Sequence, residues 1–392
     1  MVYYGQMNIL FISEIYLPTV SGVATSTDSI VRFMASRGHH VYLICPRPMA
    51  PYEAPPLPGL EIIYTPRLRD PILVNKPMTV IPLGLWEIWR TIATRNIDVV
   101  HIQEPGSLGI MTLLIAKLYR LPIVGAMHFS MEQVIRMTPV FMRPLSMPLM
   151  TLYVRMVYPH YTAIMMPTKT VTKDLSALIG HPERIHAVSN GVDTTLYVPQ
   201  NGPYTALRKK YGLHPTQTYY LYLGRLDTDK NIETIVRALA STPQDIHLII
   251  AGVGTQKQPL EALAASRSVS DRIVWIAQVS IAEILDLYHL SDGFIIMSVV
   301  ETQSIVALQA IACGLPLIAA DAGALPELVR DGKNGYILPP YDAHLLAEKM
   351  VYLSTHAAIR AKMGTESRKL SLAHHKPKVL HTLELLYQSV VR

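Results

Sequence analysis

Residues 298–316 have the sequence SVVETQSIVALQAIACGLP and decide the fold. The apolar run at 293–297, directly before them, is typical of a buried strand. Small and polar residues follow, and then apolar side chains recur at helical spacing (Ile305, Leu308, Ala312) until Gly314, a residue type that commonly ends helices. The stretch therefore predicts a strand, a turn and a helix N-terminus, the unit from which parallel α/β sheets are built.

Glu301 lies in the turn between that strand and that helix. In a parallel sheet, ligands bind at the carboxyl ends of the strands, where helix N-termini direct free N–H groups at anions. A carboxylate in this place can bind the hydroxyls of a ligand. It can equally be a first-turn acid that complements the helix dipole, and the local spacing leaves both interpretations open.

The same stretch resembles the signature of the retaining GT-B glycosyltransferases of the group 1 type, in which two glutamates lie eight positions apart after a strand. The resemblance implies that Glu301 and the amides of Gln303, Ser304 and Ile305 hold the donor sugar. The second glutamate of the family binds the nucleotide ribose, and Gln309 stands there in this chain. Because a carboxamide offers one acceptor oxygen and a donor nitrogen, we expect ribose binding weaker by ~1–2 kcal/mol, without loss of function. The opening Glu-Thr-Gln is most similar to the branch that glycosylates diacylglycerol-type lipids.

Composition limits the class of protein. A chain of 392 residues predicts two domains, and 50% hydrophobic with 16% charged residues is apolar for a soluble protein. We expect no transmembrane segment and no secretory signal, because no apolar run is long enough. Cys45 and Cys313 follow no metal or disulfide spacing, which favours a reduced, cytoplasmic setting. The net charge of +6 suits an anionic membrane face or a sugar nucleotide; without a nucleic-acid motif, nucleic acid is not an expected partner.

A second strand exit carries cations. The apolar residues 219–223 are followed by Gly224, Arg225 and, after a short loop, Lys230. The arginine can bind a diphosphate by a forked pair of hydrogen bonds and the lysine as a point charge, and the order Gly-Arg-Leu…Lys is similar to the family's phosphate-binding motif. Asp227 and Asp229 have the spacing of a metal-binding Asp-x-Asp, but the loop is cationic and has no second ligand cluster, so we predict neither a metal nor another cofactor.

In the first half of the chain, two residues follow predicted strands. Gly22 lies in the turn after a strand at 7–13 and before a helix expected near 26–36. It is either a plain turn glycine or a place where backbone approaches a phosphate, and the family has a glycine-containing turn facing the donor here. His128 ends a strand at 121–127 and is either structural or, as the resemblance implies, placed beside the donor sugar and the acceptor.

Residues 131–159 combine six methionines with the interleaved cations Arg136, Arg143 and Arg155, with Phe141 among them. Prolines at 139, 144 and 148 predict that the segment is broken into short pieces. Such a sequence is typical of an adaptable apolar groove, of a surface seated among anionic headgroups, or of a buried segment between helices. The resemblance places the acceptor region near here and favours a lipid acceptor.

Strands alternate with helices through both halves, which predicts an α/β fold of two Rossmann-like domains with parallel sheets facing across a cleft. We expect an N-terminal acceptor-binding domain at 1–197 and a C-terminal nucleotide-sugar-binding domain at 198–372. Residues 373–392 carry one apolar stripe and, by resemblance, form a helix that packs back on the N-terminal domain.

The hypothesis from the sequence is a metal-independent, retaining transferase that moves a sugar from a UDP-hexose-type donor to a lipid such as diacylglycerol, on the inner face of the cell membrane. His128, Glu301, Arg225 and Lys230 are the expected catalytic residues. Three alternatives remain: transfer to a soluble acceptor, epimerisation of a sugar nucleotide, and non-catalytic binding of one.

Overall fold

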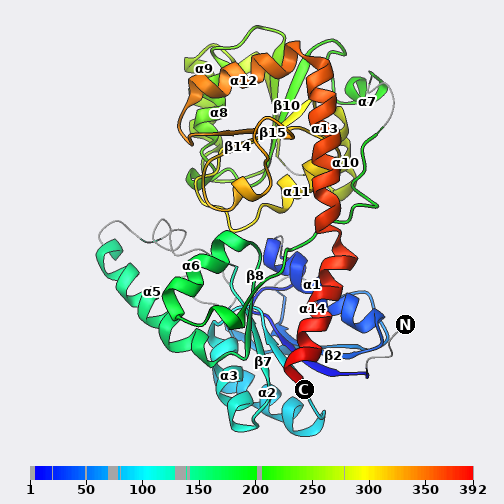
Figure 1. The fold of residues 1–392 in the computed structure, drawn as a ribbon, viewed down its shortest axis with the longest axis vertical. Helices are drawn as coiled ribbons and strands as arrows, with labels where there is room; N and C mark the ends of the chain where they lie inside the picture. The colour runs from blue at the N-terminus through cyan, green and yellow to red at the C-terminus, as the bar shows by residue number, and fades with distance from the viewer. Residues whose placement is uncertain are drawn as a thin grey trace. The chain divides into compact units, whose positions relative to one another are not determined.

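The structure, a computed structural model, describes residues 5–19, 21–48, 51–68, 78–79, 81–128, 138, 142–200, 205–277 and 279–391. The chain forms two compact units, one of Met1–Asn190 with Pro377–Arg392 and one of Gly191–Lys376. Each unit is described by itself below, with the element labels of Figure 1.

The first unit is built on a seven-stranded parallel sheet in the order β3-β2-β1-β6-β7-β8-β9. Its central strands are nearly continuous runs of buried apolar residues, as expected when both faces of a parallel sheet are covered by helices, whereas the edge strands β3 and β9 are only partly buried. They are β1 (Asn8–Ile12), β2 (His40–Pro46), β3 (Leu60–Thr65), β6 (Val99–Ile102), β7 (Ile123–Ala126), β8 (Ala163–Met166) and β9 (Ile185–Ala187). The short strands β4 (Arg67–Leu68) and β5 (Met78–Thr79) form a separate antiparallel pair.

The helices of this unit are α1 (Gly22–Ser36), α2 (Ile81–Thr94), α3 (Ser107–Leu118), α5 (Arg143–Val157), α6 (Lys169–Ile179) and α14 (Lys376–Val391). Helix α1 begins four residues earlier than the sequence predicted. The reason is local, because the Ser21 hydroxyl accepts a hydrogen bond from the amide of Ala24 at 3.0 Å and so caps the helix at that point.

The prediction that prolines break residues 131–159 into short pieces is wrong for α5, which is one continuous helix of 15 residues. Pro144 lies in the first turn, where a backbone N–H has no intrahelical partner to lose. Pro148 is inside the helix but only one turn later. Its missing N–H therefore leaves only one carbonyl, in the first turn, without its intrahelical hydrogen bond.

Helix α14 confirms the predicted return of the C-terminal segment to the N-terminal unit. Leu383 and Tyr387 belong to the same buried cluster as Phe11 of β1. The Tyr387 hydroxyl lies 2.7 Å from Nδ1 of His101, and the buried carboxylate of Glu384 lies 3.0 Å from Nε2 of His39. The helix is therefore fastened to β1, β2 and β6 by polar as well as apolar contacts.

The second unit has a six-stranded parallel sheet in the order β12-β11-β10-β13-β14-β15. The strands are β10 (Thr218–Leu223), β11 (Ile246–Ala251), β12 (Ile273–Ile276), β13 (Gly293–Ile296), β14 (Leu317–Ala320) and β15 (Gly335–Leu338). The helices are α7 (Thr205–Lys210), α8 (Ile232–Leu239), α9 (Lys257–Ser266), α10 (Ile281–Leu290), α11 (Ile305–Ala312), α12 (Ala343–Thr355) and α13 (Ala357–Ser371). The two units are thus both Rossmann-like, as the sequence predicted (Figure 1).

The sheet order decides where the site of the second unit lies. Strands β10 and β13 are neighbours, with Tyr220 opposite Gly293, although about 70 residues separate them in the chain. A side chain at 293 would meet the Tyr220 ring, because a Cβ there would lie 2.9 Å from it. The loops that follow β10 and β13 therefore leave the same edge of the sheet side by side.

Candidate active site

The loops after β10 and β13 are joined to each other by their backbones. The amide of Val299 donates a hydrogen bond to the carbonyl oxygen of Asp229 at 3.0 Å. Residues 228–230 form a single 3₁₀ turn, which brings Lys230 back toward the β13 side. The hydrogen bond between the two loops fixes the distance between the two predicted motifs.

Lys230 and Glu301 meet at this edge of the sheet. The ammonium Nζ of Lys230 lies 2.7 Å from Oε1 of Glu301 and 3.3 Å from Oδ2 of Asp229. The lysine and glutamate side chains are each 15% exposed. Burial alone would lower the pKa of Lys230, but the charges of Glu301 and Asp229 outweigh it and raise the pKa above the usual value. The lysine is therefore a fixed positive charge at any physiological pH.

Arg225 lies in the same loop but has a different partner. Its guanidinium pairs with the carboxylate of Asp227 and is 61% exposed. The other oxygen of that carboxylate faces the backbone amide and hydroxyl of Thr255, at 3.5 and 3.4 Å. Asp227 is thus the counter-ion of the arginine, a contact that the sequence analysis did not predict.

The backbone of Glu301 is held by the loop after β14. Its carbonyl oxygen accepts a hydrogen bond from the amide of Ala324 at 2.9 Å. Gly323 has a positive φ of 53°, and a Cβ there would lie 2.4 Å from the same carbonyl oxygen. The close approach keeps the Glu301 backbone in one position while its carboxylate faces Lys230.

Helix α11 begins directly after these residues, as predicted. The Ser304 hydroxyl accepts a hydrogen bond from the amide of Ala307 at 3.3 Å and caps the helix. The first amides of a helix have no intrahelical acceptor, and they carry the positive end of its dipole. Ile305 opens the helix, so this end of α11 can donate hydrogen bonds to hydroxyls or anionic oxygens.

Gln309, on the next turn of α11, lies between two tyrosines. Its Oε1 accepts a hydrogen bond from the Tyr288 hydroxyl at 3.0 Å, and its Nε2 donates one to the Tyr197 hydroxyl at 3.0 Å. Tyr197 and Tyr288 were not predicted from the sequence, because they are 91 residues apart and come together only in the folded unit.

Gly22 and His128 lie in the first unit, each near the carboxyl end of a strand of its sheet. Gly22 is the exposed first residue of α1 and follows the capping Ser21. His128 comes two residues after β7. Burial lowers the pKa of His128 to about 4, and among the described residues its Nε2 atom has no hydrogen-bond partner. The imidazole is therefore neutral at pH 7 and has a nitrogen available for one further hydrogen bond.

Two acidic residues that the sequence analysis did not select lie at the same edge of this sheet. Glu14 follows β1 and Glu104 follows β6. Glu104 accepts a hydrogen bond from the amide of Glu14 at 3.1 Å, and Glu14 accepts one from the amide of Leu108 at 2.8 Å, in the first turn of α3. Burial raises the pKa of Glu104 to about 8. An acid just after a predicted strand was the only signal of these residues in the sequence.

The cationic and apolar residues expected near the acceptor lie partly in α5. Arg136 and Phe141 fall outside the described residues. Arg143 and Arg155 are exposed at the two ends of α5, and their Nε atoms donate to the carbonyls of Thr138 and Leu178, each at 3.2 Å. Of the α5 side chains, only Val154 is buried, so the alternative of a buried segment between helices does not hold for α5.

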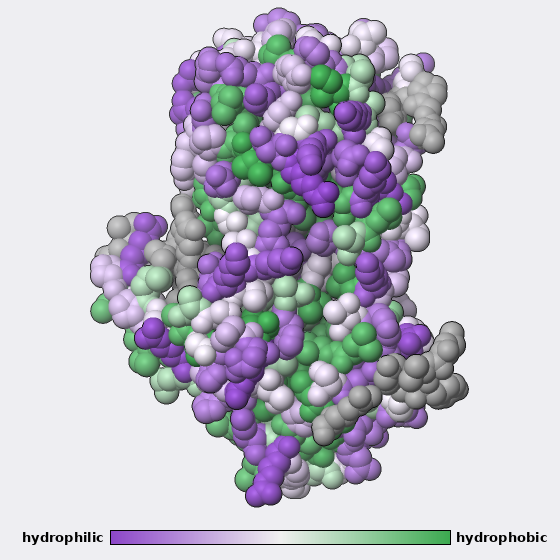
Figure 2. All heavy atoms as spheres, in the orientation of Figure 1, coloured by the Kyte–Doolittle hydropathy of each residue, from purple (hydrophilic) through white to green (hydrophobic). Residues whose placement is uncertain are grey.

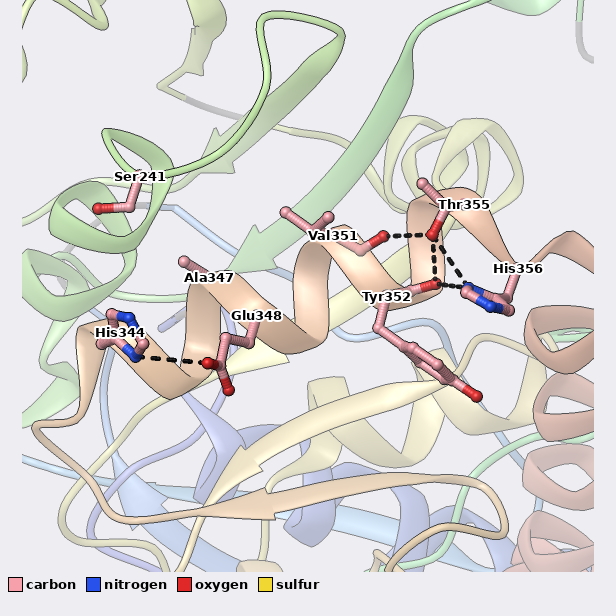
Figure 3. A pocket seen from close by; sticks show the side chains of 8 residues that line it. All are labelled: Ser241, His344, Ala347, Glu348, Val351, Tyr352, Thr355 and His356. Atoms are coloured by element: carbon pink, nitrogen blue, oxygen red, sulfur yellow. Dashed lines mark hydrogen bonds and ion pairs between the residues drawn. The ribbon is translucent and has the colours of Figure 1, made fainter.

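One hollow of the described residues lies away from these loops. It has a volume of about 450 Å³ and is lined mainly by α12, with His344, Glu348, Val351 and Tyr352 among its residues (Figure 3). None of the predicted site residues lines it. Within the described part of the chain, no three His, Cys, Asp or Glu side chains are grouped so as to hold a metal ion. No helix of that part is both long and apolar enough to cross a bilayer.

Comparison with known proteins agrees with this arrangement. Residues 204–370 match the family "Glycosyl transferases group 1", and residues 20–196 match "Glycosyltransferase Family 4". Residues 204–370 thus form a group 1 glycosyltransferase domain, and the chain is a glycosyltransferase with the two-domain GT-B fold.

Individual relatives cover nearly the whole chain. The alpha-monoglucosyldiacylglycerol synthase of Acholeplasma laidlawii is 25% identical, over 98% of both chains. The N-acetyl-alpha-D-glucosaminyl L-malate synthase of Bacillus anthracis is 22% identical, over 96% of both. Among solved structures, a sucrose-phosphate synthase from Thermosynechococcus elongatus superposes with a TM-score of 0.80 at 18% identity, over 98% of this chain and 99% of that one. Anabaena HepE, in complex with UDP and glucose, superposes with a TM-score of 0.77 at 17% identity, over 98% of this chain and 100% of that one.

Proposed function

We propose that this glycosyltransferase moves a hexose from a UDP-sugar to the hydroxyl of a lipid acceptor such as diacylglycerol, with retention of the anomeric configuration, at an anionic membrane surface on the cytoplasmic side. The observation that carries the lipid part of the proposal is an apolar stripe on the exposed face of α5. The relative from Acholeplasma, whose name contains diacylglycerol, supports the same acceptor class.

The α5 stripe consists of Leu145, Leu149, Leu152 and Met156, whose side chains are between 54% and 64% exposed. The intervals of four, three and four residues place them on one side of the helix. Arg143 and Arg155 lie near its two ends, and no acidic residue occurs in the helix. Green atoms mark apolar side chains in the region of α5 in Figure 2. An apolar stripe bordered by arginines suits the boundary between acyl chains and anionic headgroups.

A second exposed apolar surface lies on the packed pair α2 and α3. Trp86 and Trp89 of α2 are 58% and 45% exposed, with ring centres 5.3 Å apart. Leu114 and Leu118 of α3 are 66% and 79% exposed. Tryptophans are enriched at membrane interfaces because their rings are amphipathic. This surface therefore adds to the support for membrane binding by the first unit.

The donor part of the proposal rests on the second unit. Arg225 and Lys230 provide the positive charges that a leaving diphosphate needs, so we infer that the reaction requires no metal ion. Glu301 and the first amides of α11 are placed to hold sugar hydroxyls, and Gln309 to contact the ribose. The UDP and glucose in the structure of HepE support a UDP-sugar donor.

The roles of His128 and Gly22 depend on the closure of the two units over the donor, which stays a prediction. A neutral imidazole can hold a hydroxyl of the sugar or the acceptor without adding charge. The exposed Gly22 would allow backbone to approach the diphosphate. The configuration would be retained if the acceptor hydroxyl attacks the anomeric carbon from the same face that the diphosphate leaves. The leaving phosphate would accept the proton of the acceptor hydroxyl.

The direct test incubates the purified full chain with UDP-, GDP- and ADP-hexoses and with vesicles of phosphatidylglycerol that contain diacylglycerol, and detects the product by mass spectrometry. We expect a glycosyl-diacylglycerol from a UDP-sugar, with chelator present and absent. NMR of the product gives its anomeric configuration. Transfer to water-soluble acceptors alone, for which the malate-named relative is the precedent, would contradict the lipid acceptor.

The α5 stripe has its own test. Leu145→Glu combined with Leu149→Glu should reduce sedimentation with anionic vesicles and transfer to diacylglycerol, while UDP binding stays unchanged. Leu372→Glu, at a 48% exposed leucine of the second unit, is the matched control. Equal vesicle binding by both variants would remove the stripe from the proposal.

A further inference from the structure

The charged residues at the exits of β10 and β13 are not a plain cationic pocket. Two cations, Arg225 and Lys230, lie among three carboxylates, those of Asp227, Asp229 and Glu301. The five groups together carry a net charge of minus one. A diphosphate bears at least two negative charges, so the unliganded arrangement does not by itself attract it.

The two cations are held in different ways. Lys230 is enclosed between two carboxylates, and all three side chains are between 15% and 18% exposed. Arg225 has one carboxylate partner in Asp227 and is 61% exposed. The arginine can therefore leave its partner at little energetic cost, since exposed ion pairs are weak. Lys230 would have to break two less exposed contacts.

Asp227 is less mobile than the arginine that it binds. Its side chain is 23% exposed, and its second oxygen faces the amide and hydroxyl of Thr255 in the loop after β11. That loop is itself fastened to the arginine's loop, because the amides of Leu226 and Gln256 bond to the carbonyls of Val253 and Leu226 at 2.9 and 2.8 Å. The aspartate thus stays in place when the guanidinium moves.

We propose that Asp227 is a positioning residue that holds Arg225 as a counter-ion while the donor site is empty, and that competition between this carboxylate and the diphosphate sets the affinity for the nucleotide. The inference rests on the proposed function, because it takes the diphosphate to bind Arg225. It adds a residue that weakens binding of both donor and product, which favours release of the nucleoside diphosphate after transfer.

Asp227→Asn is the informative variant. The carboxamide has nearly the same size and retains an oxygen that can face Thr255, but it removes the charge that competes for the guanidinium. We expect UDP to bind about 3- to 10-fold more tightly, because exposed ion pairs of this kind have small free energies. We also expect a lower KM for the sugar nucleotide with an unchanged or lower kcat, since the product leaves more slowly.

A double-mutant cycle with Arg225→Ala separates the counter-ion role from simple repulsion. If Asp227 acts through the arginine, Asp227→Asn should change UDP affinity little in the Arg225→Ala background. An equal gain in both backgrounds would mean that Asp227 repels the diphosphate directly, and would overturn the proposal. Asp271→Asn is the control for overall charge, because Asp271 is exposed in the turn before β12, at the amino edge of the sheet.

The measurement is isothermal titration calorimetry of the full-length protein with UDP, together with steady-state kinetics and thermal unfolding of each variant. Binding of UDP to the wild type, with unchanged or weaker binding to Asp227→Asn of normal stability, would overturn this inference and leave the proposed function intact. Failure of the wild type to bind any nucleoside diphosphate would contradict both.

Discussion

The ammonium of Lys230 lies 2.7 Å from the carboxylate of Glu301, a residue 71 positions further along the chain. The contact joins the predicted phosphate-binding loop to the predicted sugar-binding loop. It exists because β10 and β13 are adjacent strands of a parallel sheet and therefore end at the same edge. The two motifs thus form a single charged group, to which Asp229 also belongs.

Lys230→Ala should lower the stability of the second unit as well as abolish transfer. The variant leaves two carboxylates facing each other with little exposure, and we expect a loss of about 1–3 kcal/mol in the free energy of unfolding, less than for a fully buried pair. Urea denaturation measures this loss. The double variant Lys230→Ala with Glu301→Ala should recover part of it, and strict additivity would contradict the pairing.

The matched control for that experiment is Lys210→Ala. Lys210 makes an ion pair of nearly the same length, 2.8 Å to Asp286 against 2.7 Å for Lys230 to Glu301, but its side chain is 61% exposed. We expect little change in stability there, because solvent screens the pair.

Arg225→Ala should reduce kcat by at least ~100-fold, because the guanidinium is expected to neutralise charge on the departing diphosphate. The thermal midpoint should not change, since the side chain is exposed and pairs only with Asp227 among the contacts described for it. Arg237→Ala, at another exposed ion pair of the same unit, should leave activity unchanged. Near-normal turnover of Arg225→Ala would remove the arginine from the mechanism.

Gln309→Glu should tighten binding of the nucleoside diphosphate about 5- to 10-fold, if the residue contacts the ribose as proposed, because a charged acceptor forms stronger hydrogen bonds to the two hydroxyls. Tyr197 and Tyr288 can both donate to the new carboxylate, so we expect the unit to remain folded. Calorimetry with UDP and with 2′-deoxy-UDP tests the assignment. A gain that is the same for both nucleotides would indicate that Gln309 only links the tyrosines.

Glu104→Gln should change how stability depends on pH. Burial raises the pKa of Glu104 from 4.5 to about 8, so the folded protein keeps this proton up to about pH 8 whereas the unfolded chain loses it near pH 4.5. Between these values the unfolded state binds fewer protons, and stability falls as pH rises, by at most about 1.4 kcal/mol per pH unit. The glutamine variant lacks this dependence.

Denaturation at pH 5 and pH 8 should therefore show that Glu104→Gln loses less stability than the wild type between the two. Parallel pH profiles for the two proteins would show that Glu104 is ionised in the folded state.

The regular elements that could be predicted were those with strong local signals. The strands at 219–223 and 293–297 are short apolar runs followed by turn residues, and the predicted terminator Gly314 lies two residues after the end of α11. Helices α2 and α3 were not predicted. Helix α3 is apolar on most sides and so has no clear helical period, and α2 carries Pro82 and Gly84 in its first turn. Proline is tolerated there because the first N–H groups of a helix lack partners.

By itself the sequence determined the fold class, the family and the two loops of the second unit that carry charge, because each depends on spacing within about 20 residues. Only the tertiary structure decided which polar groups are paired. Lys230 with Glu301, Gln309 with Tyr197 and Tyr288, and Glu14 with Glu104 each join residues that are between 21 and 112 positions apart. The order of strands in a sheet brings such residues together, and that order follows from the burial of whole strand and helix faces, which no local pattern encodes.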